Sequence, residues 1–179
     1  MNPASNLVLV GPMGAGKTSI GKRLALRLGL RFVDADHRLE EITGAPVPVI
    51  FECEGETGFR VRESQLLAEL MQGSGQLVAT GGGAILTEDN RRRLRERGFV
   101  VYLKVSVDHQ LERLARDRNR PLLADGDKRA KLEALAAVRG ELYEQVADLV
   151  FDSDGLAVAT ACDRLGDLVQ AQWRREEAA

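Results

Sequence analysis

A glycine-rich segment near the start of the chain, residues 11–18 with the sequence GPMGAGKT, constrains the fold more than any other feature. It follows an apolar run at residues 7–10 and leads into a helical pattern with Ile20, Leu24 and Leu28 on one face. A strand, a G-x-x-x-x-G-K-[ST] loop and a helix are the setting in which backbone amides cradle nucleotide phosphates. The segment therefore predicts a phosphate-binding loop, with Lys17 reaching the β- and γ-phosphates and Thr18 ligating Mg²⁺.

The composition of the chain limits the classes of protein to which it can belong. The chain has 179 residues, 44% hydrophobic and 29% charged, as expected for one globular domain that buries a full core. A net charge of −2 gives no reason to expect nucleic-acid binding. We find no signal-peptide pattern and no stretch long enough to span a membrane, so we expect a cytoplasmic protein without a membrane partner. Cys53 and Cys162 are predicted to be buried free thiols.

Short apolar runs alternate with helical patterns along the chain. Strands are expected at residues 7–10, 31–33, 77–80, 100–105 and 149–151, and helices at 16–28, 55–71, 88–97, 107–116, 128–147 and 156–174. This alternation predicts one α/β domain over residues 1–179, with a mostly parallel sheet and helices on both faces. Residues 35–62 insert a short helix, a turn and a second helical start. Residues 116–127 carry the charges, proline and glycine of an exposed mobile lid.

Two carboxylates, Asp34 and Asp36, close the second expected strand. Side chains alternate along a strand, so both are expected to point the same way at the edge where open α/β sheets bind ligands. One would hold Mg²⁺ through water while the other accepts a proton from a substrate hydroxyl. The alternative is that Asp36 is a solvated cap of the helix that begins at His37.

Three glycines, Gly81, Gly82 and Gly83, follow the third strand, where many P-loop proteins place an aspartate. Their bare amides would let a ligand approach closely, although a flexible turn is the alternative. In the inserted region Arg60 and Glu63 share a helix face. The pair is equally consistent with an arginine that grips a substrate carboxylate and with an ordinary exposed ion pair.

For the other polar residues, the local sequence does not decide between a functional role and a structural one. Arg120 lies in the expected lid, where an arginine over the phosphates would offset charge on the γ-phosphoryl group, but a solvated charge run is the alternative. Arg139 lies in a helical pattern without further context. His37 and His109 begin helices and belong to no cluster of metal-ligating residues.

In type, order and spacing these motifs resemble those of the shikimate kinase family over about residues 6–152. The family carries a GxMGxGK[ST] loop, a D-x-D pair, G-E-x-x-F-R-x-x-E, GGG, R-P-L-L and R-x-x-L-Y-x-x-V-A. Here these motifs fall at residues 11–18, 34–36, 55–63, 81–83, 120–123 and 139–147. The resemblance implies a P-loop NTPase fold like that of nucleoside monophosphate kinases, with a five-stranded parallel sheet in the order 2-3-1-4-5.

The resemblance also implies residue roles. Arg60 and Arg139 would hold the shikimate carboxylate, and the hydroxyls would meet Asp36 and the glycine turn. Asp36 would accept or orient the proton of the 3-hydroxyl, while Lys17 and Arg120 neutralise the transferring phosphoryl group. Mg²⁺ would bind Thr18 and, through water, Asp34. Contacts to ATP are expected from Gly14, Ala15, Gly16, Lys17, Thr18, Ser19, Arg113 and Arg120.

We therefore expect a monomeric kinase that uses ATP to phosphorylate the 3-hydroxyl of shikimate, giving shikimate 3-phosphate on the pathway to chorismate and aromatic amino acids. A gluconate-type kinase with the same core is one alternative, but it gives no reason for the acidic, arginine and glycine motifs together. A GTPase-like switch is a second, disfavoured because the chain has no N-K-x-D guanine signature. The intact motifs also argue against a catalytically idle relative.

Overall fold

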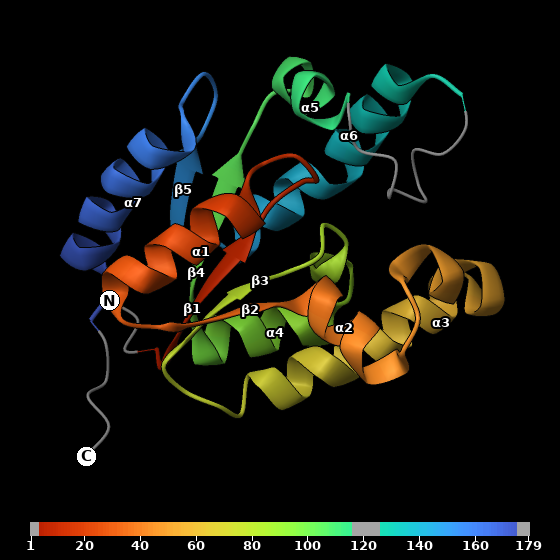
Figure 1. Ribbon diagram of the computed structural model, residues 1–179, viewed down its shortest axis with the longest axis horizontal. Coiled ribbons are helices and arrows are strands. Elements are labelled where there is room, and N and C mark those ends of the chain that lie inside the picture. Colours follow the sequence, from red (N-terminus) through yellow and green to blue (C-terminus); the bar gives the residue numbers. More distant parts are fainter. Residues whose placement is uncertain (1–3, 116–125, 175–179) are drawn as a thin grey trace.

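Five parallel strands form one sheet in the computed structural model, which describes residues 4–115 and 126–174 (Figure 1). The strands are β1 (Asn6–Val10), β2 (Arg31–Asp34), β3 (Gln76–Ala79), β4 (Gly98–Lys104) and β5 (Leu149–Asp152). Their order across the sheet is β2-β3-β1-β4-β5, which confirms the expected topology. β1 lies in the middle, and all five of its residues are buried. The continuous apolar run at residues 7–10 is typical of a parallel strand covered on both faces.

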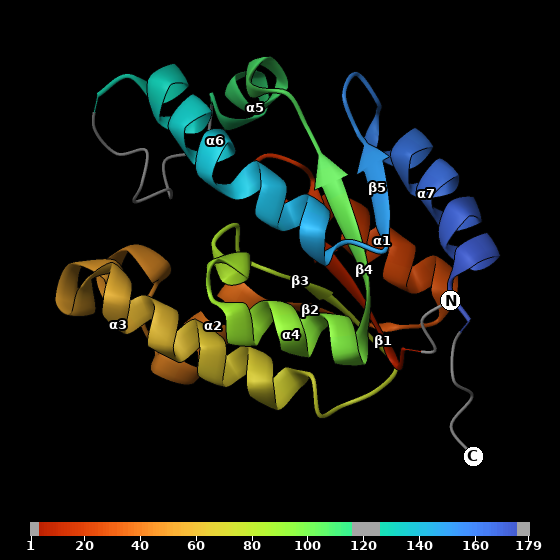
Figure 2. The same ribbon diagram turned by 180° about the vertical axis from the view of Figure 1, so that it is seen from behind.

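Helices cover both faces of the sheet. On one face lie α1 (Lys17–Leu28) and α7 (Val158–Gln172), which pack on each other (Figure 1). On the other lie α3 (Val47–Leu70), α4 (Glu88–Arg97) and α6 (Lys128–Val146), seen from behind in Figure 2. The remaining elements are α2 (Ala35–Thr43), α5 (Val107–Leu114) and the short 3₁₀ helix η1 (Ala84–Leu86).

Two hydrophobic clusters fill the space between the sheet and these helices. One contains Leu24 of α1 and Leu165 of α7, and the other contains Leu67 of α3 and Leu94 of α4. All four of these side chains are fully buried. Because the apolar face of each helix is removed from water on the sheet, the loops at the carboxyl ends of the strands are held in fixed places.

The inserted region differs from its sequence-based prediction. The helix expected at residue 55 begins at Val47, and its axis breaks at Gly55, where φ is 69° and ψ is 179°. The helical segment after this break agrees with the expected start at residue 55. The helical turn at residues 47–54 was not expected, because Pro46 and Pro48 indicate a turn but are also compatible with a helix start, where no backbone donor is needed. The break lets the first half of α3 lean away from the sheet as an arm, at the right of Figure 1.

The two ends of the described chain lie side by side and are linked by a hydrogen bond. The indole nitrogen of Trp173 donates a hydrogen bond of 2.9 Å to the carbonyl oxygen of Ala4. The same indole stacks on Phe99, with ring centroids 6.3 Å apart. These contacts hold the end of α7 beside the amino end of β1.

Two smaller predictions concern the cysteines and the membrane. Cys162 is buried as expected, but Cys53 is exposed, so that part of the prediction was wrong. Cys53 lies in the first half of α3, which extends beyond the sheet and leaves this side chain uncovered. Among the described residues, no helix is both long and apolar enough to cross a membrane.

Candidate active site

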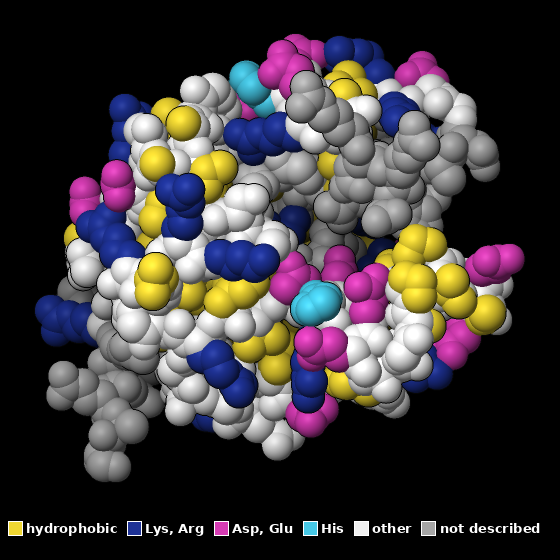
Figure 3. All heavy atoms as spheres, viewed as in Figure 1, with side chains coloured by type: hydrophobic (Ala, Val, Ile, Leu, Met, Phe, Trp, Pro, Cys, Tyr) yellow, Lys and Arg dark blue, Asp and Glu magenta, His cyan; other side chains and the backbone are white. Residues whose placement is uncertain are grey.

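A large cavity of about 1010 Å³ opens at the carboxyl ends of the strands. In Figure 3 it forms a hollow in the face of the molecule, with acidic side chains and a histidine gathered along one rim over α2. Its lining comes from the glycine-rich loop, α2, α3, the turn after β3, α5, α6 and the loop after β5. This is the edge at which open parallel sheets bind ligands.

The glycine-rich loop has the conformation of an anion cradle. Gly14 and Gly16 have φ values of 77° and 92°, in the left-handed region that favours glycine. Gly16 caps the amino end of α1, whose first turn carries no acidic side chain. That helix end is therefore free to attract a negatively charged ligand. The Lys17 ammonium donates to the carbonyl oxygens of Gly11 at 2.7 Å and Pro12 at 2.8 Å.

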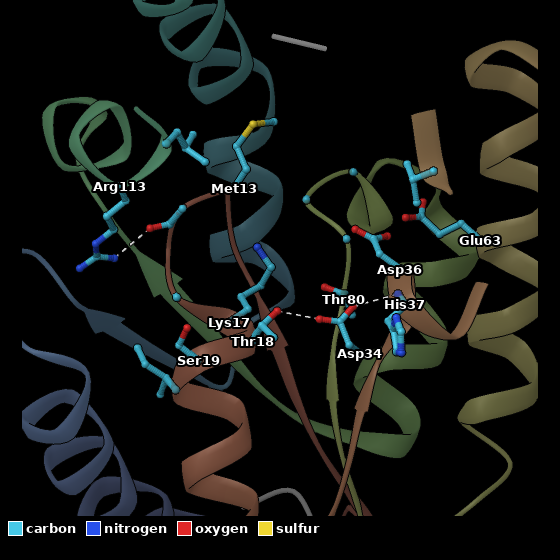
Figure 4. Close-up of a pocket in the computed structure, with 18 of the residues that line it drawn as sticks. Met13, Lys17, Thr18, Ser19, Asp34, Asp36, His37, Glu63, Thr80 and Arg113 are labelled. Atoms are coloured by element: carbon cyan, nitrogen blue, oxygen red, sulfur yellow. Dashed lines mark hydrogen bonds between the residues drawn. The ribbon is translucent and has the colours of Figure 1, made fainter. Parts of the chain in front are cut away.

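Asp34 links this loop to the start of α2. Its carboxylate accepts a 2.6 Å hydrogen bond from the Thr18 hydroxyl and, as the cap of α2, a second one from the backbone N–H of His37 (Figure 4). The expectation that Asp34 and Asp36 alternate along one strand was wrong. Because Asp34 caps the helix, the chain turns at Ala35, and Asp36 lies in the first turn of α2. Both carboxylates nevertheless line the cavity.

The oxygen donors beside the loop fit a Mg²⁺ ion that takes only a few of its ligands from the protein. A hydroxyl and a carboxylate, Thr18 and Asp34, are hard oxygen donors that suit this ion. Among residues 4–115 and 126–174, however, no group of three or more His, Cys, Asp or Glu side chains could hold a metal. Proteins that supply so few ligands bind Mg²⁺ together with substrate phosphates and water.

Opposite the loop, Arg60 of α3 is fixed by two glutamates. Its guanidinium donates to Glu63 at 2.9 Å and to Glu56 at 3.2 Å. The side chain is only 15% exposed, so the ordinary surface ion pair is not what the structure shows. The guanidinium packs on Gly83, where a Cβ atom would collide with Cζ, Nη1 and Nη2. Only glycine leaves room for Arg60 in this position.

Glu63 and Asp36 meet across the same turn. A Cβ atom on Gly81 would lie 2.8 Å from Asp36 Oδ1 and 2.8 Å from Glu63 Oε2, so both oxygens point at one place. Figure 4 shows these carboxylates across the cavity from Lys17. Burial raises the pKa of the Glu63 carboxyl, and Arg60 only partly opposes this effect. Glu63 Oε2 is buried and has no hydrogen-bond partner among the described residues.

Arg139 and Tyr143 approach the glycine turn from α6. Arg139 is 5% exposed, and its guanidinium lies against Gly82. The Tyr143 hydroxyl donates a 2.5 Å hydrogen bond to the Gly82 carbonyl oxygen. Burial raises the pKa of Tyr143 to about 12, although the neighbouring Arg139 acts in the opposite direction. Tyr143 follows Arg139 by four residues, so both side chains lie on one helix face, but this spacing alone predicts no role for Tyr143.

Side chains from α5 support the phosphate loop. The Gln110 amide donates to the Met13 carbonyl oxygen at 2.9 Å, and Arg113 donates to that of Gly14 at 2.9 Å. Arg113 also donates to the Ser153 carbonyl oxygen at 3.1 Å, so it bridges the loop and the segment after β5. Gln110 is buried, and nothing in the sequence analysis pointed to it.

Almost all the site residues expected from the sequence therefore line one cavity. Ala15 is the exception within the loop: it is buried, and its N–H donates to the Pro12 carbonyl oxygen. Arg120 and most of the expected lid at 116–127 lie outside the described residues. Of the residues expected from the sequence, those that line the cavity are Gly14, Gly16, Lys17, Thr18, Ser19, Asp34, Asp36, Arg60, Gly81, Gly82, Gly83, Arg113 and Arg139.

The sheet order and the phosphate loop define a P-loop NTPase of the nucleoside-monophosphate-kinase type. A family model for shikimate kinase matches residues 13–170. Shikimate kinases of Stenotrophomonas maltophilia (strain R551-3) and Xanthomonas campestris pv. campestris (strain 8004) are 54% and 56% identical to the chain. The alignments cover 99% of this chain and 98% of the first relative, and 97% of this chain and of the second. The chain belongs to the shikimate kinase family.

A solved structure agrees with this assignment. Shikimate kinase from Acinetobacter baumannii, in complex with shikimate, superposes with a TM-score of 0.91 at 45% sequence identity. The superposition covers 94% of both chains.

Proposed function

We propose that this protein uses ATP to phosphorylate the 3-hydroxyl of shikimate, giving shikimate 3-phosphate and ADP. The observation that carries the proposal is that one cavity has two differently built halves. A phosphate loop forms one half, and Arg60, Arg139 and Asp36 converge on a glycine turn in the other. Shikimate has a carboxylate and several hydroxyls, which match guanidinium donors and carboxylate acceptors. The family membership and the shikimate-bound relative support the same acceptor.

On the acceptor side, Arg60 and Arg139 would hold the carboxylate, and the bare backbone at Gly81, Gly82 and Gly83 would let the ring lie close. Asp36 would orient the 3-hydroxyl or accept its proton. Phosphoryl transfer requires little covalent chemistry from a protein, so correct placement of the hydroxyl supplies much of the catalysis. The buried Glu63, paired with Arg60, holds that arginine in place.

On the phosphate side, Lys17 would exchange its hydrogen bonds to the loop carbonyls for the β- and γ-phosphates of ATP. Mg²⁺ bound by Thr18 and, through water, by Asp34 would neutralise phosphate charge. Arg113 and residues 14–19 would complete the ATP site.

Arg120 would act from the lid at residues 116–127, and residues 35–62 would form the acceptor arm of a single domain. Closure of the lid would exclude water and suppress hydrolysis of ATP. We also propose that the protein is a monomer and that it works in the cytoplasm.

An ADP-release assay with Mg·ATP, comparing shikimate, gluconate and no acceptor, tests the function. Release that depends on shikimate is the expected result. Release with gluconate alone would support the phosphate site but would mean that the acceptor half binds gluconate instead of shikimate. Release without any acceptor, or a strong preference for GTP, would argue against a metabolite kinase of this kind.

A further inference from the structure

Tyr143 is buried behind the glycine turn that lines the acceptor half of the cavity, yet the proposed reaction gives it no task. It is 2% exposed, and its ring stacks on Tyr102 with centroids 5.0 Å apart. Packing alone would be served equally well by phenylalanine. A buried hydroxyl costs free energy unless it is hydrogen-bonded, so the contacts of this hydroxyl explain what it contributes.

The hydroxyl is bonded to the glycine turn. Tyr143 donates to the Gly82 carbonyl oxygen at 2.5 Å, across 61 positions of the sequence. A run of three glycines restricts its own backbone very little, so the orientation of each peptide plane depends on such outside contacts. The peptide bonds of the described chain are all trans, and each peptide unit is planar. Fixing the Gly82 carbonyl therefore also fixes the N–H of Gly83, which points the opposite way.

The same oxygen and the Arg139 guanidinium converge on Gly82: a Cβ atom added there would lie 3.6 Å from Tyr143 Oη and 3.4 Å from Arg139 Nη1. The Arg139 charge opposes the effect of burial on the pKa of the phenol. That pKa stays raised, to about 12, so the hydroxyl is protonated and remains a donor at neutral pH. A donor with a free lone pair can serve a carbonyl and a guanidinium at once.

We infer that Tyr143 is a positioning residue for the acceptor, because its hydroxyl sets the Gly82–Gly83 peptide and the Arg139 guanidinium relative to each other. This inference rests on the proposed function, in which both groups face shikimate. α6 supplies the arginine and β3 leads into the turn, so Tyr143 is the link between the two elements that hold opposite parts of one small molecule.

Tyr143→Phe tests this link, and Tyr102→Phe is its matched control. Tyr102 stacks on Tyr143, but the structure gives its hydroxyl no hydrogen-bond partner among the described residues. For Tyr143→Phe we expect the KM for shikimate to rise about 5- to 20-fold, the cost of one buried hydrogen bond, while the KM for ATP stays within about twofold. Tyr102→Phe should leave both constants within about twofold.

Several outcomes would overturn the inference. An unchanged KM for shikimate in Tyr143→Phe would do so, as would an equal rise in both KM values or the same change in Tyr102→Phe. A wild-type protein that ignores shikimate would overturn the proposed function, and the inference with it. If the wild type phosphorylates shikimate and Tyr143→Phe has the same KM for shikimate, the inference is wrong but the proposed function stands.

A second measurement needs no substitution at Tyr143. The chain contains two tyrosines, so ¹³Cζ-tyrosine labelling gives two NMR signals, and Tyr102→Phe assigns them. Saturating shikimate should shift the Tyr143 signal more than the Tyr102 signal. If the Tyr143 signal does not move when shikimate binds, its hydroxyl does not sense the acceptor and the inference is wrong.

Discussion

Gly83→Ala is the substitution with the sharpest expected consequence. Gly83 has φ −96° and ψ 4°, which an L-residue can adopt, so alanine strains no backbone. Its Cβ atom would collide with the guanidinium of Arg60. The guanidinium must therefore move, and its hydrogen bond to Glu63 is lost.

The magnitude follows from that displacement. A hydrogen bond to a charged group contributes about 1.5–3 kcal/mol. If Arg60 no longer reaches the shikimate carboxylate, the Kd for shikimate rises about 10- to 150-fold. The free energy of unfolding falls by less than about 3 kcal/mol, because alanine also restricts the unfolded chain and offsets about 0.4–1 kcal/mol. Binding of ATP, in the other half of the cavity, stays near its wild-type value.

Titration calorimetry with shikimate, and steady-state kinetics with ATP, measure the two effects. Gly140→Ala on α6 is the control, because nothing lies within 4 Å of its added Cβ atom. Adding Gly83→Ala to Arg60→Ala should change shikimate binding no further, since the group it displaces is already gone. Wild-type binding by Gly83→Ala, or an effect that persists in the Arg60→Ala background, would refute the reasoning.

The remaining predictions concern three charged residues of the acceptor half. Asp36→Asn should lower kcat at least about 100-fold with little change in ATP binding, and near-normal turnover would remove Asp36 from the mechanism. Arg60→Ala should weaken shikimate binding but not ATP binding, whereas Arg62→Ala, which breaks an exposed pair with Glu54, should affect neither; equal losses for both ligands would assign Arg60 to the fold. The pKa of Glu63 is raised from 4.5, so its contribution to stability is complete below that pH and is lost as pH rises through the folded value. Denaturant melts should therefore show wild type losing stability relative to Glu63→Gln as the pH rises above 4.5, and parallel pH curves would contradict the raised pKa.

Local patterns were sufficient for most of the fold. Residues 7–10 read as a buried strand because a parallel strand is apolar on both faces, and the glycine-rich loop specifies its own backbone. The order of the strands came from the family resemblance, since strand–helix alternation does not say which strands are neighbours. The start of α3 and the exposure of Cys53 were missed because both depend on how α3 extends beyond the sheet.

Part of the candidate site could also be predicted from the sequence and part could not. Residues in short motifs, such as Lys17 and Arg60, could be named from their sequence context and the resemblance. The two supporting side chains, Gln110 and Tyr143, could not, because their partners lie 97 and 61 positions away in sequence. Contacts of that kind exist only after the sheet has brought α5 and α6 to the loop and the turn.

The hydrogen bond between Trp173 and Ala4 has a practical consequence for how the molecule can be handled. Ala4 precedes the amino end of β1, while the cavity opens at the carboxyl end, about 16 Å further along this five-residue strand. Segments attached through Ala4 or Trp173, such as an affinity tag, a surface tether or a second enzyme, would thus leave from the edge opposite the cavity. These two residues are suitable attachment points for immobilised or fused forms that keep the cavity open to small molecules.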